Sequence, residues 1–98
     1  MKIVSWNCGG LGRKYKKDSA RDLIRMENIS ILLIQETKLG EIEMIEYTTK
    51  IWKGSKVVAS EVRGASRGIC TFWNLEEHEL QDTKKEQHLL MVNLRIKK

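Results

Sequence analysis

Two polar side chains, Asn7 and Glu36, stand at the ends of two short apolar segments of the sequence. Residues 2–8 and 30–36 each predict a buried strand, and residues 18–28 between them predict an amphipathic helix. Strand, helix and strand in this order form a βαβ unit, whose two parallel strands end at the same edge of the sheet. Because adjacent strands lie about 4.8 Å apart, we expect Asn7 and Glu36 to converge on one small site. A carboxylate and a carboxamide supply the hard oxygen ligands that Mg²⁺ or Ca²⁺ prefers.

The spacing of Asn7 and Glu36 alone leaves two simpler interpretations open. Asn7 precedes Cys8-Gly9-Gly10 and is also typical of a turn, since asparagine tolerates turn conformations. Glu36 is also typical of a solvated strand end. The shared site is therefore a hypothesis, and its support has to come from other parts of the chain.

The two helices have recognisable ends in the sequence. Asp18 or Ser19 is expected to cap the first helix, and Asn28 is expected to end it, because asparagine tolerates the left-handed conformation. Residues 41–50 predict a second helix, since glutamates stand near its start and lysines near its end, as the helix dipole favours.

The C-terminal half of the chain predicts further strands. Residues 55–62 and 68–74 are expected to form an antiparallel pair, joined by a connection at residues 64–68. Residues 75–87 are rich in charged side chains and predict a turn or a solvated excursion, and residues 88–96 predict the last strand. The sequence therefore predicts an α/β chain with one mixed sheet that starts with a βαβ unit.

Three segments together resemble the endonuclease/exonuclease/phosphatase superfamily, which includes deoxyribonuclease I-like enzymes and abasic-site endonucleases. Within it, the chain most resembles the endonuclease domain of LINE-type non-LTR retrotransposons, especially those of plants. The segments follow one another in the family's order: Lys-Ile-Val-Ser-Trp-Asn-Cys-Gly-Gly-Leu-Gly at residues 2–12, Ile-Gln-Glu-Thr-Lys at residues 34–38, and Gly-Ala-Ser-Arg-Gly-Ile-Cys-Thr-Phe-Trp-Asn at residues 64–74.

The resemblance implies a four-layer αββα sandwich with its site at one edge, between two sheets. Residues 1–98 would form the N-terminal portion of such a domain. Glu36 would bind the divalent metal, Mg²⁺, and Asn7 would orient the phosphate or the metal ligands. The implied activity is metal-dependent cleavage of a phosphodiester, with DNA as the partner.

The sequence also departs from the family's pattern. The later family motifs, a Tyr-Gly-Pro-like segment, an Asp-x-Asn pair and a C-terminal Ser-Asp-His, do not appear, and the chain contains no proline. Gly9 stands where the retrotransposon relatives carry arginine and the abasic-site enzymes aspartate, and Arg67 replaces a glycine of the Gly-x-Ser-Gly-Gly turn. We therefore expect a fragment of such a domain that is inactive alone.

Other titratable residues do not replace the missing catalytic base in this interpretation. His78, within Glu-Glu-His-Glu, is expected in a solvated turn and lacks the histidine pair of a zinc helix. His88 is expected to be structural or exposed, and Asp82 to lie in a turn. Glu36, as a lone carboxylate, would hold Mg²⁺ only weakly.

A net charge of +5 favours a polyanionic partner such as nucleic acid. The densest basic cluster comprises Arg13, Lys14, Lys16 and Lys17. These side chains form either a solvated loop or an edge of the site that contacts phosphate. Cys8 and Cys70 are expected to be free, buried thiols. No secretory signal or membrane-spanning run is recognisable, so an intracellular location and no membrane partner are expected.

Two functions follow from these observations. The first is a retrotransposon-derived fragment of a Mg²⁺-dependent endonuclease, itself inactive. The alternative is a non-catalytic nucleic-acid-binding or interaction module that retains the sheet and the basic loop. In either case one sheet face would lack its cover, so the chain should be unstable, self-associate or need a partner.

Overall fold

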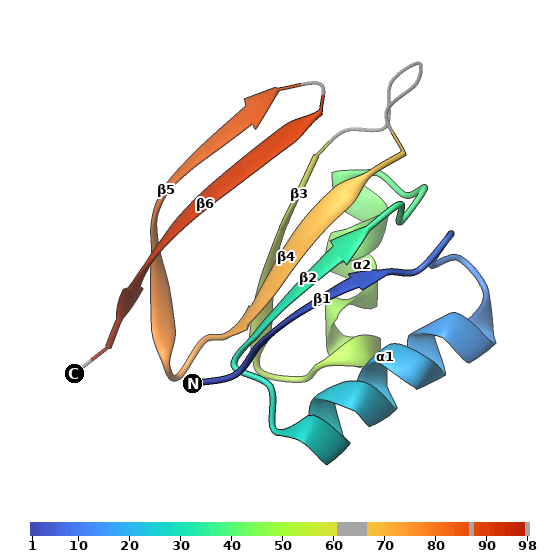
Figure 1. Cartoon of the computed structure of the whole chain (residues 1–98), viewed down its shortest axis with the longest axis horizontal. Helices are drawn as coiled ribbons and strands as arrows, with labels where there is room; N and C mark the ends of the chain where they lie inside the picture. Colours follow the sequence, from blue (N-terminus) through green and yellow to red (C-terminus); the bar gives the residue numbers. More distant parts are fainter. Residues whose placement is uncertain (61–66, 87, 98) are drawn as a thin grey trace.

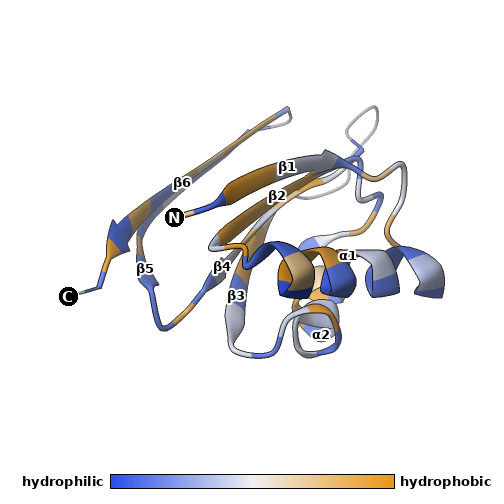
Figure 2. Cartoon of the chain, turned by 60° about the horizontal axis from the view of Figure 1, so that its bottom comes forward, coloured by the Kyte–Doolittle hydropathy of each residue, from blue (hydrophilic) through white to orange (hydrophobic). Residues whose placement is uncertain are grey.

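A computed structural model of the chain describes residues 1–60, 67–86 and 88–97. One four-stranded sheet carries both helices on one face, and a two-stranded hairpin lies beside its other face (Figures 1 and 2). The elements are β1 (Ile3–Asn7), α1 (Lys14–Glu27), β2 (Ile31–Gln35), α2 (Glu41–Ile51), β3 (Ser55–Ala59), β4 (Ile69–Asn74), β5 (His78–Glu86) and β6 (Leu89–Ile96).

The predicted βαβ unit is confirmed. Strands β1 and β2 pair in parallel, and Asn7 at the end of β1 lies opposite Gln35 at the end of β2. Strand β1 is nevertheless an edge strand, since the sheet order is β1-β2-β4-β3. Its Val4 and Trp6 pack against the core, whereas Ile3 is 57% exposed. The first strand is therefore half-buried rather than buried on both faces.

Helix α1 begins four residues before the sequence predicts. Arg13 is its N-cap residue, and Asp18 lies inside the helix, where it pairs with Lys14 and Arg21 instead of capping the first turn. The predicted end is confirmed, because Asn28 adopts the left-handed conformation with φ of 51°. Its backbone N–H closes the last turn on the carbonyl of Ile24.

The second half of the sheet is antiparallel, as predicted. Strand β4 pairs with β2 on one side and with β3 on the other, so that the sheet is mixed. Helix α2 spans nearly the predicted residues and packs beside β3. The predicted continuation of β3 to residue 62 lies outside the described residues, as does most of the connection at residues 64–68.

Strand β5 corrects one sequence prediction. Residues 75–87 were expected to be a turn or a solvated excursion, but most of them form one strand of an antiparallel hairpin with β6. Asp82, expected in a turn, pairs with Asn93 beside a bulge. A polar segment has little strand propensity of its own, so this segment is a strand because it pairs with the apolar strand β6.

The hydrophobic core lies on the helix side of the sheet (Figure 2). Leu32, Ile34 and Phe72 are fully buried there, beneath Ala20 of α1 and Met44 of α2. No helix in the described part of the chain is long and apolar enough to cross a membrane.

The opposite sheet face borders an apolar groove of about 450 Å³, which separates the sheet from the hairpin. The hairpin thus covers that face only in part. The groove is lined by Ile3, Ile31, Leu33, Thr71, Leu89, Leu90, Met91, Val92 and Leu94.

Candidate active site

The structure brings Asn7 and Glu36 together at the carboxyl edge of β1 and β2. Asn7 is the last residue of β1, and Glu36 follows directly after β2. The Asn7 side chain lies close enough to the Glu36 carboxylate to lower the pKa of that carboxyl group. The predicted proximity is therefore present, while the roles of the two residues in binding a phosphate or a metal stay predictions.

Glu36 leaves the sheet in an unusual backbone conformation. Its φ is 58°, in the left-handed region that residues other than glycine seldom occupy, and Lys38 repeats this with φ of 60°. Such strain persists only where surrounding contacts fix it, and it is often found at functional sites. Between these two residues, Thr37 is fully buried, and its hydroxyl bonds to the backbone of Leu39.

Backbone hydrogen bonds from two other segments hold this strained loop. Leu11 N–H donates to the carbonyl of Thr37 over 2.9 Å, which ties the loop after β1 to the loop after β2. Thr37 N–H donates to Gly68 over 3.1 Å, and Lys38 N–H donates to Arg67 over 2.6 Å. Glu36 is thus positioned by residues that are distant in sequence.

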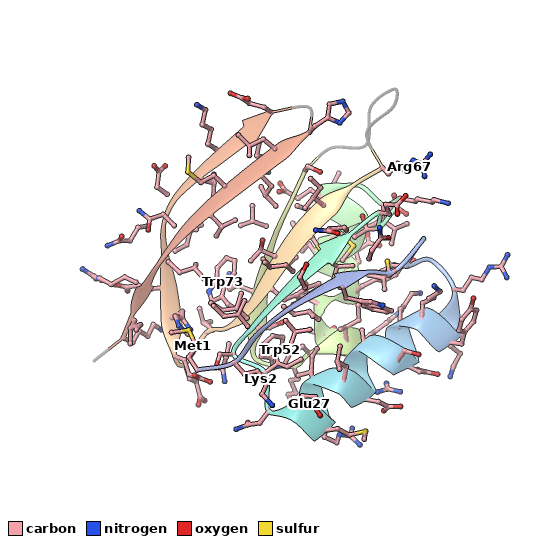
Figure 3. All side chains as sticks on the ribbon, viewed as in Figure 1. Met1, Lys2, Glu27, Trp52, Arg67 and Trp73 are labelled. Carbon is pink, nitrogen blue, oxygen red and sulfur yellow. The ribbon has the colours of Figure 1, made fainter. Side chains whose placement is uncertain are left out.

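Among the described residues, Arg67 forms an ion pair with Glu36. Its Nη1 atom lies 2.7 Å from Glu36 Oε1, and it reaches the site from the segment before β4 (Figure 3 labels Arg67). The Arg67 hydrogen bond, followed by the Asn7 hydrogen bond, holds the pKa of the Glu36 carboxyl below its ordinary value of 4.5. The Lys38 charge acts in the same direction.

The depressed pKa of Glu36 leads to a prediction for Arg67→Ala. A carboxyl group whose pKa is lower in the folded state stabilises the fold above its ordinary value of 4.5, and this contribution disappears as pH falls through the folded-state pKa. Removing the guanidinium should raise the pKa of Glu36 towards 4.5. Carbon-13 NMR titration of the glutamate side chains would measure the shift.

Glu41 provides the internal control for that titration. The pKa of Glu41 is also lowered, but by Lys85 of the hairpin rather than by Arg67. Its midpoint should therefore be the same in the wild-type chain and in Arg67→Ala. Equal midpoints for Glu36 in the two proteins would show that the ion pair does not form in solution.

The four residues of the predicted basic cluster have different surroundings. Lys16 donates a hydrogen bond to the carbonyl of Cys8, directly after Asn7, and so reaches the site. Lys14 pairs with Asp18, and Lys17 lies 3.8 Å from the ring centre of Tyr47.

The basic cluster therefore converges only in part on the site. Arg13 is exposed at the start of α1. Sequence reasoning missed Lys38 and the contact of Arg67 with Glu36. Lys38 directly follows the Gln-Glu-Thr segment, and Arg67 replaces a glycine of the family's turn. Both positions in the sequence could therefore have indicated a place near the site.

Both cysteines are free and buried, as predicted. Burial raises the pKa of the Cys8 thiol, and burial likewise raises the pKa of the Cys70 thiol. Each is therefore a neutral thiol at physiological pH. Neither is a candidate nucleophile or metal ligand, because thiolates perform both tasks.

His78 corrects another prediction. It was expected in a solvated turn, but its side chain is only 3% exposed at the start of β5. Neither ring nitrogen has a hydrogen-bond partner among the described residues. It lines a hollow with Met1 and Lys2 at the amino end of β1, the end opposite Glu36. His78 therefore does not supply a base to the site.

The described residues do not by themselves fit a resident Mg²⁺ ion. Mg²⁺ prefers octahedral oxygen coordination, usually with one or two carboxylates and further ligands from a substrate. In the described ranges, no group of three acidic, histidine or cysteine side chains is placed to hold a metal. Glu36 is the carboxylate that the described residues place beside Asn7, and Arg67 already pairs with it. The edge offers two oxygen-bearing side chains surrounded by positive charge.

The fold is the feature that this chain shares with proteins of known structure. A mixed sheet that begins with a parallel pair and carries helices on one face is the arrangement of the deoxyribonuclease I-like α/β sandwich, which solved relatives share. The AP endonuclease of Archaeoglobus fulgidus superposes with a TM-score of 0.65 and 24% identity, over 86% of this chain and 30% of that one. The 3′ phosphatase NExo of Neisseria, bound to a product DNA hairpin, superposes with a TM-score of 0.66 and 21% identity, over the same 86% of this chain and 30% of that one.

Sequence similarity agrees with the fold. The chain is 43% identical over 63 residues to the DNA repair nuclease APEX1 of Danio rerio, a match that covers 57% of this chain and 20% of that protein. The catalytic domain of Xenopus laevis APE2 is 25% identical, with a TM-score of 0.58, over 86% of this chain and 26% of that one. No family model matches the chain.

In sequence and fold the chain is therefore similar to AP endonucleases, which are members of the endonuclease/exonuclease/phosphatase superfamily. The chain spans about a fifth of the curated relative that it matches. It spans between about a quarter and a third of the solved relatives.

Proposed function

We propose that this chain is the N-terminal part of a nucleic-acid phosphodiesterase domain, in which Asn7 and Glu36 form the phosphate-binding corner. One observation carries the proposal: the two side chains meet at the carboxyl edge of β1 and β2, in a fold shared with AP endonucleases. Ligands of α/β sheets gather at such strand ends. The Asn7 carboxamide can donate to a phosphate oxygen, and Lys16, Lys38 and Arg67 add positive charge nearby.

The same surroundings argue against hydrolysis by this chain alone. Attack on a phosphodiester requires a group that activates water and charge that stabilises the leaving oxygen. Glu36 is engaged by Arg67, and the histidine and aspartate considered as bases, His78 and Asp82, lie in the hairpin. We therefore propose that the chain binds nucleic acid without cleaving it, and that any Mg²⁺ is held only weakly.

A non-catalytic binding module is the second candidate function. The net charge of +5 and the positive side chains around the edge favour it. Neither candidate cuts the bound strand as this chain alone. They differ in whether the chain is part of a nuclease domain or a module whose own function is binding.

DNA binding and cleavage can be measured on the same protein. Fluorescence anisotropy with a labelled duplex should show binding that weakens as salt rises, because phosphate contacts release counterions. The double variant Arg13→Ala/Lys38→Ala should reduce the log–log salt slope by up to about 2, since each lost phosphate contact removes about 0.9. Lys53→Ala/Lys56→Ala removes the same charge from exposed positions at the start of β3 and should leave the slope close to wild type.

Plasmid nicking in Mg²⁺ completes the test. The wild-type chain and Glu36→Gln should both leave supercoiled plasmid intact. Nicking by the wild-type chain that Glu36→Gln abolishes would contradict the proposed inactivity and favour a working nuclease. A salt slope equal in all binding variants would contradict the proposed surface.

A retrotransposon origin is part of the proposal. The three sequence segments resemble LINE-type endonucleases, and Gly9 and Arg67 are departures that a decayed copy would accumulate. Genomic sequence downstream of residue 98 distinguishes the alternatives. Tyr-Gly-Pro, Gly-Asp-Phe-Asn and Ser-Asp-His segments there would identify a truncated gene.

Self-association through the partly uncovered sheet face is a further proposal about partners, with a second copy of the chain as the occupant. Ile3, Leu89 and Met91 are each about half exposed around the apolar groove. β1 is also an edge strand, and its free edge offers backbone groups for pairing. Both features favour contact with another apolar, edge-bearing surface such as the same face of a second copy.

A further inference from the structure

The Arg67 guanidinium contacts the Glu36 carboxylate directly. Its Nη1 atom lies 2.7 Å from Glu36 Oε1, which is the distance of a charge-assisted hydrogen bond. The Glu36 side chain is 28% exposed, and the Arg67 side chain is 68% exposed. The Glu36 side chain is thus less exposed than that of its partner.

The backbone around this ion pair fixes Arg67 in place. Arg67 accepts a 2.6 Å hydrogen bond from Lys38 N–H, and its neighbour Gly68 accepts a 3.1 Å bond from Thr37 N–H. Gly68 permits this approach because a Cβ at its position would lie 2.3 Å from Thr37 Oγ1. Two surface side chains that meet by chance have no such constraint. Here the backbone hydrogen bonds between residues 37–38 and residues 67–68 hold Arg67 beside Glu36.

A cation at Glu36 would have to compete with this guanidinium. The Arg67 guanidinium occupies a lone pair of Glu36 Oε1 that a metal could use, and its positive charge a few ångströms away repels a divalent ion. We propose that Arg67 is a built-in counter-ion that replaces the metal at Glu36 and so suppresses divalent-cation binding at this edge. The proposal rests on the cation- and phosphate-binding role proposed for Glu36 and Asn7.

The size of the effect follows from the exposure of the pair. An exposed ion pair contributes little because water and salt screen it. Arg67→Ala should therefore tighten the binding of Mn²⁺ to Glu36 by about three- to tenfold, not by orders of magnitude. Mn²⁺ alone is the probe, and electron paramagnetic resonance measures the free ion during titration of the full chain.

Arg95→Ala is the matched control for Arg67→Ala. Arg95 is 64% exposed and pairs with Glu79 of the hairpin, so its removal deletes an equally exposed arginine from another ion pair. Mn²⁺ affinity should be unchanged in Arg95→Ala. Arg67→Gln, which retains a donor and much of the side-chain bulk, gives a second reading if Arg67→Ala fails to fold by circular dichroism.

Three outcomes decide the proposal. Tighter binding in the Arg67 variants that Glu36→Gln abolishes would support it. Equal affinity of the wild-type chain and the Arg67 variants, with weaker binding in Glu36→Gln, would overturn it while leaving the proposed role of Glu36 intact. Mn²⁺ binding that ignores Glu36→Gln in every background would overturn both, and the DNA titrations would then test the phosphate corner separately.

Discussion

Replacing Gly68 with alanine is expected to lower the free energy of unfolding by about 2–5 kcal/mol, the sum of backbone strain and overpacking. Gly68 has φ of 86°, where an L-residue is strained. A Cβ there would lie 2.3 Å from Thr37 Oγ1 and 3.2 Å from the backbone nitrogen of Lys38. Neither neighbour can move easily, since Thr37 is fully buried and Lys38 N–H is bonded to Arg67.

Gly54→Ala separates the two contributions. Gly54 has φ of 87°, nearly the same as Gly68, but a Cβ there would meet no atom within 4 Å. Its substitution should therefore cost only the strain, about 1–2 kcal/mol. Urea unfolding followed by tryptophan fluorescence, with three tryptophans as probes, measures both variants. Equal costs for the two variants would mean that the close packing of Gly68 on Thr37 does not exist in solution.

The packing of Gly68 on Thr37 should also link stability to the site. If Gly68→Ala pushes the start of β4 away from the loop at residues 36–38, Arg67 moves with it and no longer contacts Glu36. The Glu36 pKa in Gly68→Ala should then shift in the direction expected for Arg67→Ala, upward towards 4.5. Gly54→Ala lies at the other end of the sheet and leaves the pair in place.

Local sequence patterns were sufficient to predict the elements with a continuous apolar signal. The run from Ile31 to Ile34 is apolar throughout, and β2 is an interior strand as such a run predicts. Asn28 ended α1 as expected, because its tolerance of positive φ is a property of the residue itself. The parallel pairing of β1 and β2 then followed from the short helical connection between them.

The elements that were missed depend on contacts distant in sequence. β5 is polar, and it is a strand because Leu80, Thr83 and their neighbours pair with β6. His78 lies near Lys2 because Asn74, at the end of β4, donates a hydrogen bond to Ser30, which in turn donates one to Lys2. Periodicity within residues 75–87 carries no information about either contact.

The candidate site, too, could be predicted from the sequence only in part. Convergence of Asn7 and Glu36 followed from strand spacing and was predicted. The contact between Arg67 and Glu36 joins residues 31 positions apart. It depends on a left-handed conformation at Glu36 that glutamate seldom adopts. No propensity rule would place it there, although the replacement of a family glycine by Arg67 marked the position.

Phe72→Ala is expected to destabilise the chain by about 3–5 kcal/mol, the usual cost of removing a buried aromatic ring. Phe72 is fully buried in β4, between Leu32 of β2 and Val57 of β3, on the helix side of the sheet. Met91 of β6 supplies the contrast, since it is 50% exposed at the groove. Met91→Ala should cost about 0–1 kcal/mol in the monomer.

The Met91 variant also tests self-association, because the cost of losing a contact depends on whether that contact exists. If a second copy covers the groove, Met91→Ala should become more destabilising as protein concentration rises, since association stabilises only the folded chain. Phe72→Ala should show the same loss of unfolding free energy at every concentration. Urea midpoints over a hundredfold range of concentration, with sedimentation velocity alongside, measure both. If the loss of unfolding free energy in Met91→Ala is small and independent of concentration, no second copy covers the groove. That result would overturn the proposed self-association.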